Sequence, residues 1–179
     1  LQRLLARYPN YPKKKEAKVA LANALFNLNE FRAAKPYFRE LLLDAKEAGE
    51  RESARLKIAE IDWALKDFTA AMAGLYEVLK NTKPDSNIAI DALLLRSRIQ
   101  SESNRVKDAQ ADYDAAVTQS KDRSNLGSNE LRTWVLLKSK YCENETNIES
   151  LRICFRQIQT RTTQDEEAQA NARAGGLDR

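Results

Sequence analysis

Apolar and polar positions along this chain follow the period of amphipathic helices, and one arrangement of them returns three times. In each copy a small residue stands in the middle of one predicted helix, and an alanine stands early in the next. The three alanines are Ala34, Ala71 and Ala109, at spacings of 37 and 38 residues. A fixed period of this length is typical of stacked helical hairpins, which build a continuous concave surface.

The small residues have a packing role in this interpretation. Two antiparallel helices approach to ~8–10 Å only where the side chains at their crossing are small. The first helix of each copy supplies one such residue, namely Ala22, Ala59 or Ser97. One turn after each alanine a larger side chain lies on the same face, namely Phe38, Leu75 or Tyr113. Short polar turns such as Asn29-Glu30 make the two helices of a copy antiparallel neighbours.

The pattern predicts four helix pairs, over 13–28 with 31–47, 50–65 with 68–81, 86–103 with 106–120, and 128–143 with 147–162. The fourth pair has Leu151 where the others have alanine, which indicates either a looser crossing or a terminal capping repeat. We interpret the chain as part of a longer repeat protein. Its expected parts are the end of a preceding hairpin and a linker (1–12), four hairpins (13–163), and a terminal helix or linker (164–179).

One stretch resembles the tetratricopeptide repeat family: from Ala20 to Phe38 it reads ALANALFNLNEFRAAKPYF. The resemblance extends from about Lys15 to Val117. It implies an all-α fold, a right-handed α-solenoid of antiparallel helix hairpins with about four hairpins plus partial ends. The usual period of the family is about 34 residues, shorter than the spacings here, so other helical-hairpin repeats stay open.

Composition argues against an enzyme. The 179 residues include no histidine, which removes the commonest general base and the usual zinc sites. No Gly-rich phosphate loop occurs, so we expect no catalytic residues, no cofactor and no metal. No apolar run approaches the ~20 residues that a membrane-spanning helix needs. The expected function is a non-catalytic protein–protein interaction scaffold that binds a partner peptide or protein in its concave groove.

The resemblance implies that the first helix of each hairpin lines this groove. The groove residues are then Asn23, Phe26, Asn27, Lys57, Glu60, Trp63, Arg98, Glu102, Lys140 and Asn144. Trp63 lies off the buried stripe of its helix, so it is either a binding anchor, flanked by Phe26 of the previous hairpin, or a residue tucked under the adjacent hairpin. The family also implies that Asn23 contacts an extended peptide backbone. The other hairpins lack this asparagine, so the carboxylate clamp of chaperone-binding members is not reproduced.

Charge raises an alternative, an RNA- or anionic-ligand-binding helical solenoid that uses Lys57, Arg98 and Lys140. The formal net charge is +4. Nucleic-acid-binding proteins gather their lysines and arginines on one face, whereas here only Lys13-Lys14-Lys15 forms a run. A solvated surface with mild excess charge is therefore favoured over a nucleic-acid partner.

Both cysteines, Cys142 and Cys154, fall in the fourth hairpin. They form either a disulfide, as in an oxidising compartment, or a pair of buried thiols. The segment from Leu4 to Pro12 resembles the inter-repeat linker of bacterial envelope tetratricopeptide proteins, such as outer-membrane assembly lipoproteins and Tol–Pal accessory proteins. This implies a periplasmic or outer-membrane-associated location, with the cytoplasm as the alternative.

Overall fold

The computed structural model describes residues 7, 12–120, 127–143 and 145–175, and within these residues the fold is entirely α-helical. The helices are α2 (Lys14–Asn27), α3 (Phe31–Asp44), α4 (Ala48–Ala64), α5 (Phe68–Asn81), α6 (Asn87–Glu102), α7 (Val106–Gln119), α8 (Gly127–Glu143) and α9 (Ile148–Gly175). No helix in the described part of the chain is both long and apolar enough to span a bilayer.

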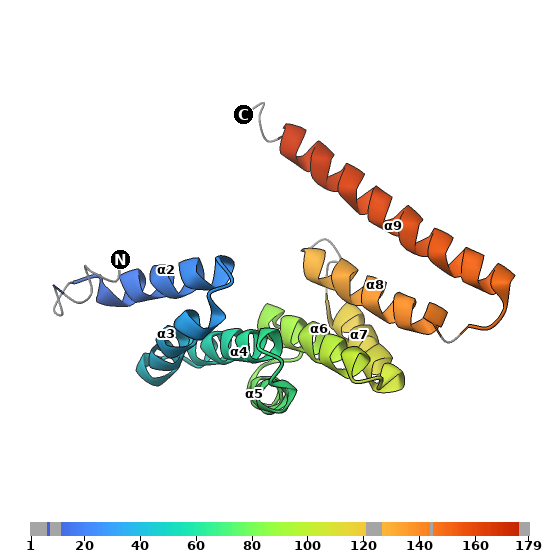
Figure 1. Ribbon diagram of the computed structural model, residues 1–179. Coiled ribbons are helices and arrows are strands. Elements are labelled where there is room, and N and C mark those ends of the chain that lie inside the picture. Colours follow the sequence, from blue (N-terminus) through green and yellow to red (C-terminus); the bar gives the residue numbers. More distant parts are fainter. Residues whose placement is uncertain (1–6, 8–11, 121–126, 144, 176–179) are drawn as a thin grey trace.

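Each helix packs against the next one along the chain, and α6 also contacts α4 and α8. The result is an open arc in which α2 and α8 lie on either side of the opening, while α5 lies on the outer side (Figure 1). Apolar residues form clusters between successive helices instead of one central core. This arrangement is compatible with a helical-repeat fold.

The turns within the first three helix pairs are built alike. Asn29, Lys66 and Asn104 have positive φ angles of 60°, 65° and 60°, at the same spacings of 37 and 38 residues as the three alanines. After each of them, the next amide donates to a carbonyl five residues earlier, as from Glu30 to Leu25 (2.9 Å). This is the Schellman pattern that ends a helix sharply, so the three turns reverse the chain in the same way.

The small residues lie where the paired helices cross. Ala34, Ala71 and Ala109 are all 0% exposed. In the third pair the Ser97 hydroxyl donates to the Ala109 carbonyl oxygen at 2.7 Å, which places the two small positions directly against each other. A partly buried ion pair between Lys35 and Asp62 adds a polar link between α3 and α4.

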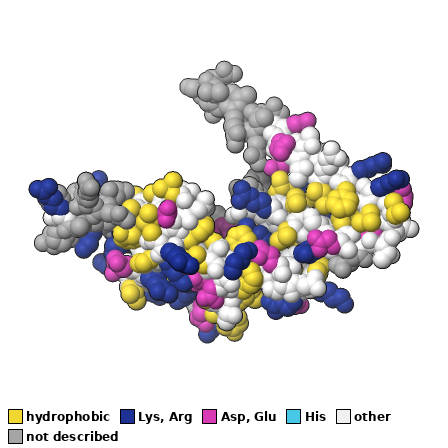
Figure 2. Space-filling model, viewed as in Figure 1, with side chains coloured by type: hydrophobic (Ala, Val, Ile, Leu, Met, Phe, Trp, Pro, Cys, Tyr) yellow, Lys and Arg dark blue, Asp and Glu magenta, His cyan; other side chains and the backbone are white. Residues whose placement is uncertain are grey.

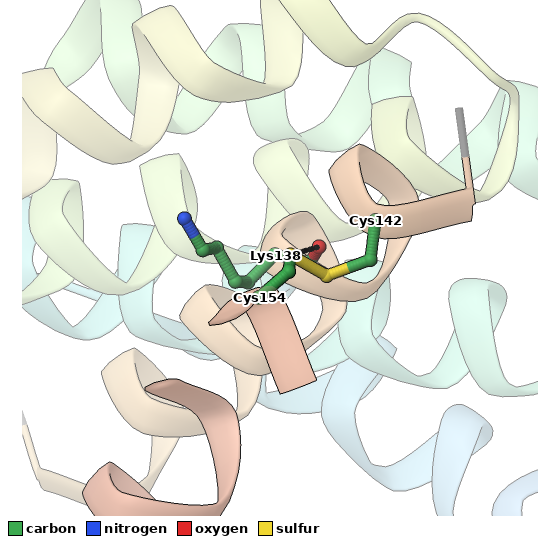
Figure 3. The surroundings of a disulfide bond; sticks show 3 residues. All are labelled: Lys138, Cys142 and Cys154. Carbon is green, nitrogen blue, oxygen red and sulfur yellow. Dashed lines mark hydrogen bonds between the residues drawn. A yellow bond between two sulfur atoms is a disulfide. The ribbon is translucent and has the colours of Figure 1, made fainter. Parts of the chain in front are cut away.

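The fourth pair is held differently. Cys142 of α8 and Cys154 of α9 form a disulfide with a Cα–Cα distance of 6.0 Å (Figure 3). The Cys154 sulfur also lies 3.8 Å from the Lys138 carbonyl oxygen. The covalent link joins the two helices where the other pairs rely on an alanine crossing.

The last helix is longer than the expected pair 128–143 with 147–162, because α9 continues without a break to Gly175. Its polar extension lacks proline, and glycine occurs only at its end. The segment expected as a linker or separate helix (164–179) therefore continues α9 as far as Gly175. In the predicted preceding hairpin and linker (1–12), residues 1–6 and 8–11 lie outside the described residues, as do Asn144 and residues 176–179.

Candidate functional site

Three successive first helices carry two groups of contacting side chains. Phe26 of α2 contacts Lys57 of α4, which pairs with Glu60. Trp63 of α4 contacts Arg98 and Glu102 of α6, and the charge of Glu60 acts on Arg98. All six are among the residues that the sequence assigns to the groove. We call this set, together with Lys66, the inner strip.

Trp63 is the centre of the inner strip. The Arg98 guanidinium lies 4.9 Å from the centroid of its indole ring, a favourable cation–π geometry. The indole Nε1 donates to Glu102 Oε1 at 3.0 Å, and Lys66 reaches the other oxygen of the same carboxylate at 3.2 Å. Trp63 is half-buried and also packs against the apolar cluster between α4, α5 and α6. It therefore combines features of both expected roles, since it supports the core and keeps an exposed part.

Phe26 does not flank Trp63 as expected. Its ring packs edge-on against Phe31 at 5.5 Å and Phe38 at 6.3 Å, both in its own helix pair. The Lys57 ammonium lies over the ring at 4.8 Å and pairs with Glu60 at 2.7 Å. Among the described residues, the ring contacts of Phe26 are therefore with Phe31, Phe38 and Lys57, and none is with Trp63.

A cavity of 340 Å³ opens between α2 and α4, beside the inner strip. Its lining is mainly apolar and includes Val19, Phe38, Leu41 and Ala54. Asn23, Ser53 and Lys57 supply polar groups at its margin, and Lys15 and Glu50 also line it and form an ion pair at 2.6 Å. The cavity is large enough for one or two apolar side chains, with hydrogen-bonding groups beside them.

Charge in this region is nearly balanced. The Glu60, Asp91 and Glu102 carboxylates act through charge on Arg98, while Arg132 opposes them. Burial is the largest influence and lowers the pKa of the Arg98 guanidinium. Burial likewise raises the pKa of the Asp91 carboxyl, although Asn129 hydrogen-bonds to it. Figure 2 shows basic and acidic side chains interspersed on the face in view, without a continuous basic patch.

Some predicted groove residues stand apart from the inner strip. Asn27 is exposed at the end of α2. Lys140 pairs with Glu143 of its own helix at 2.8 Å, and Asn144 is not described. Lys66 and Asp91 are not among the groove residues predicted from the sequence. Lys66 follows directly after a predicted first helix, and its partner Glu102 is 36 residues later, which is about one repeat period. Residues one period apart lie at similar places in adjacent helix pairs, so the period could have indicated this contact.

A second polar cluster lies outside the inner strip, between α7, α8 and α9. Tyr113 donates to Glu130, and Arg161 donates to the same carboxylate at 2.6 and 2.8 Å. The Arg161 guanidinium also stacks on Trp134 at 4.4 Å. These four residues line a cavity of 970 Å³ together with Val117, Ile153, Arg156 and neighbours on α9. These contacts link α7 and α8 to α9.

Within the described residues no group of three or more cysteine, aspartate or glutamate side chains is placed to hold a metal ion. Comparisons with models of protein families, with curated proteins and with solved structures give no match. The geometry of the inner strip and its neighbouring cavity is therefore the basis of a functional proposal.

Proposed function

We propose that this chain is a non-catalytic interaction scaffold, a right-handed tetratricopeptide-like α-solenoid that binds a partner peptide or protein in its concave groove. The recurring turns and crossings support a solenoid, because three helix pairs share their turn geometry at nearly one period. A stack of such pairs presents its first helices side by side along the inner surface.

The observation that carries the proposal is the inner strip, which α2, α4 and α6 share. Aromatic and charged side chains contact one another between α2 and α4 and again between α4 and α6, beside an apolar cavity of 340 Å³. Interfaces concentrate binding energy in a few residues, among which tryptophan, tyrosine and arginine are enriched. Trp63 and Arg98 form such a pair at the centre of the strip.

Charge pairing favours a protein partner over RNA. Lys57 pairs with Glu60 and Lys140 with Glu143, and three carboxylates surround Arg98. A phosphate backbone would bring negative charge toward each of these carboxylates. The disulfide, together with the envelope-type linker resemblance, supports an oxidising location such as the bacterial periplasm.

The test is capture of proteins from the source organism on the immobilised chain, after nuclease treatment, followed by affinity measurement with the purified partner. Trp63→Ala should weaken binding by ~2 kcal/mol or more. Asn23→Ala, an exposed change at the edge of the cavity, should weaken binding without loss of stability. The matched aromatic control is Tyr76→Ala on α5, because Tyr76 is 63% exposed and lies outside the strip.

Thermal unfolding of each variant separates lost binding from lost folding, which matters because Trp63 also packs against the core. The proposal fails when folded Trp63→Ala and Asn23→Ala bind the partner as tightly as Tyr76→Ala does. It also fails when the retained ligand is nucleic acid whose affinity falls steeply with salt.

A further inference from the structure

Arg98 stands out in the inner strip because its guanidinium is held in place without a hydrogen-bond acceptor of its own. The stack on Trp63 fixes its plane. Its Nε is buried and has no hydrogen-bond partner among the described residues. The two terminal nitrogens are not among the fully buried unpaired atoms, and the residue as a whole is partly exposed.

The three carboxylates around Arg98 are engaged elsewhere. Glu60 accepts from Lys57 at 2.7 Å. Glu102 accepts from Trp63 at 3.0 Å and from Lys66 at 3.2 Å. Asp91 is hydrogen-bonded by Asn129. They lower the electrostatic cost of holding the guanidinium here, but they leave its outward N–H groups for another acceptor.

A bound arginine elsewhere on α6 shows what this site lacks. Arg96 donates from Nε to Asp112 Oδ2 at 2.6 Å and from Nη2 to Oδ1 at 2.5 Å, a two-point pairing with a carboxylate. Arg98 has the same fork but no such carboxylate. Two of the three carboxylates that act on Arg98 have a cation of their own, because Lys57 pairs with Glu60 and Lys66 pairs with Glu102.

We infer that Arg98 is the receptor for an aspartate or glutamate side chain of the bound partner, which its terminal nitrogens hold by a two-point hydrogen bond. This inference rests on the proposed function and names the chemistry of its ligand. An acidic side chain is favoured over a C-terminal carboxylate because the surface extends on both sides of Arg98. The inner strip lies on its α2–α4 side, and Arg132 of α8, whose charge acts on Arg98, lies on the other. A partner segment can therefore run past Arg98 without ending there.

The apolar cavity adds a second requirement on the same segment. Ala54 lines the cavity and Trp63 carries the stacked arginine, and both belong to α4. At a rise of 1.5 Å per residue their positions are ~14 Å apart along the helix. An extended chain covers this distance in about four residues. The partner segment should therefore place an apolar side chain about four residues from its acidic one.

In the experiment, the full chain is immobilised and used to select binders from random peptides of about twelve residues. The peptides are displayed inside a carrier protein, so that no free C-terminus is presented. Selected peptides should share an acidic residue about four positions from an apolar one. The best binder is then synthesised with blocked ends, together with its Glu→Gln or Asp→Asn counterpart. Both peptides are titrated against the wild type, Arg98→Gln, Arg98→Lys and the control Arg39→Gln, an exposed arginine on α3.

We expect at least a tenfold loss of affinity for Arg98→Gln and for the neutralised peptide, and little further loss when the two are combined. Arg98→Lys should lose less, because it keeps the charge and loses the fork. Arg39→Gln should bind like the wild type, which excludes a general effect of net charge. Circular dichroism of each variant verifies folding.

The inference would be overturned if the losses from Arg98→Gln and from the neutralised peptide added up when the two are combined. It would also be overturned if the selected peptides shared no acidic position, and this second test needs only the wild-type chain. In both cases the scaffold proposal stands if captured proteins still depend on Trp63. Preference for inorganic phosphate or a homopolymeric RNA over the peptide would likewise overturn the inference, in favour of an anion site.

Discussion

The crossing of α4 and α5 gives the most direct test of the hairpin packing. Ala71 is 0% exposed and belongs to the buried cluster that includes Leu56, Ala59, Leu75 and Val78. The two helices are already close, because a Cβ built on Gly74 of α5 would lie 3.4 Å from the Ala59 Cβ. An isobutyl group at position 71 therefore has no space without moving one helix. Overpacking of this kind costs ~1–3 kcal/mol.

For a chain of this size each kcal/mol lowers the melting temperature by about 2–4 °C, so Ala71→Leu should melt about 2–12 °C below the wild type. The assay is thermal unfolding followed by circular dichroism. Ala73→Leu is the matched control, because Ala73 lies on the same helix and is exposed. Equal melting temperatures for the two variants would refute the assignment of Ala71 to a close crossing, and with it the register of the hairpins.

Two further predictions concern the end of the molecule formed by α7, α8 and α9. Burial, together with the hydrogen bond to Glu130, raises the pKa of Tyr113 from 10.0 to about 12. The neutral phenol is thus favoured in the folded state, so the stability it contributes is complete below pH 10 and is lost between about pH 10 and 12. A phenolate absorbance titration should show one late tyrosine that disappears in Tyr113→Phe, and an unchanged curve would contradict this. Reduction of the Cys142–Cys154 disulfide should destabilise the α8–α9 pair by about 2–4 kcal/mol. A reductant should lower the melting temperature of the wild type but not that of Cys142→Ala/Cys154→Ala, and equal responses would count against the link.

The helical class and the helix positions could be predicted from the sequence because apolar periodicity depends on local spacing. The all-α prediction is confirmed, and the helices begin and end within three residues of the predicted bounds, apart from the end of α9. The positive φ at Lys66 gave less signal. Asparagine adopts that conformation readily, as at Asn29 and Asn104, whereas a lysine in the sequence does not predict it.

Side-chain pairing in the groove could not be read from the pattern. The period indicates which residues share the inner surface, but the choice between Phe26–Trp63 stacking and Lys57 over Phe26 depends on rotamers and on the tilt between helices. The cavity between α2 and α4 could not be predicted from the sequence either, since Phe38, which lines it, was expected only as a packing residue. Spacing therefore predicts a surface, whereas the distribution of charge and cavities on it requires the structure.

The contacts around Trp63 also bear on how such a groove would bind. Arg98 holds one face of the indole and Glu102 holds its Nε1, so the side chains at the centre of the strip are ordered before any partner arrives. Ordering a long side chain on binding costs about 0.5–1.5 kcal/mol, and here that cost is already met within the free protein. Charge pairs that are satisfied beforehand add little affinity, but they penalise a partner with misplaced charges. If the proposed function holds, such a groove would gain affinity from Trp63 and the apolar cavity, and specificity from Arg98, whose Nε has no hydrogen-bond partner among the described residues.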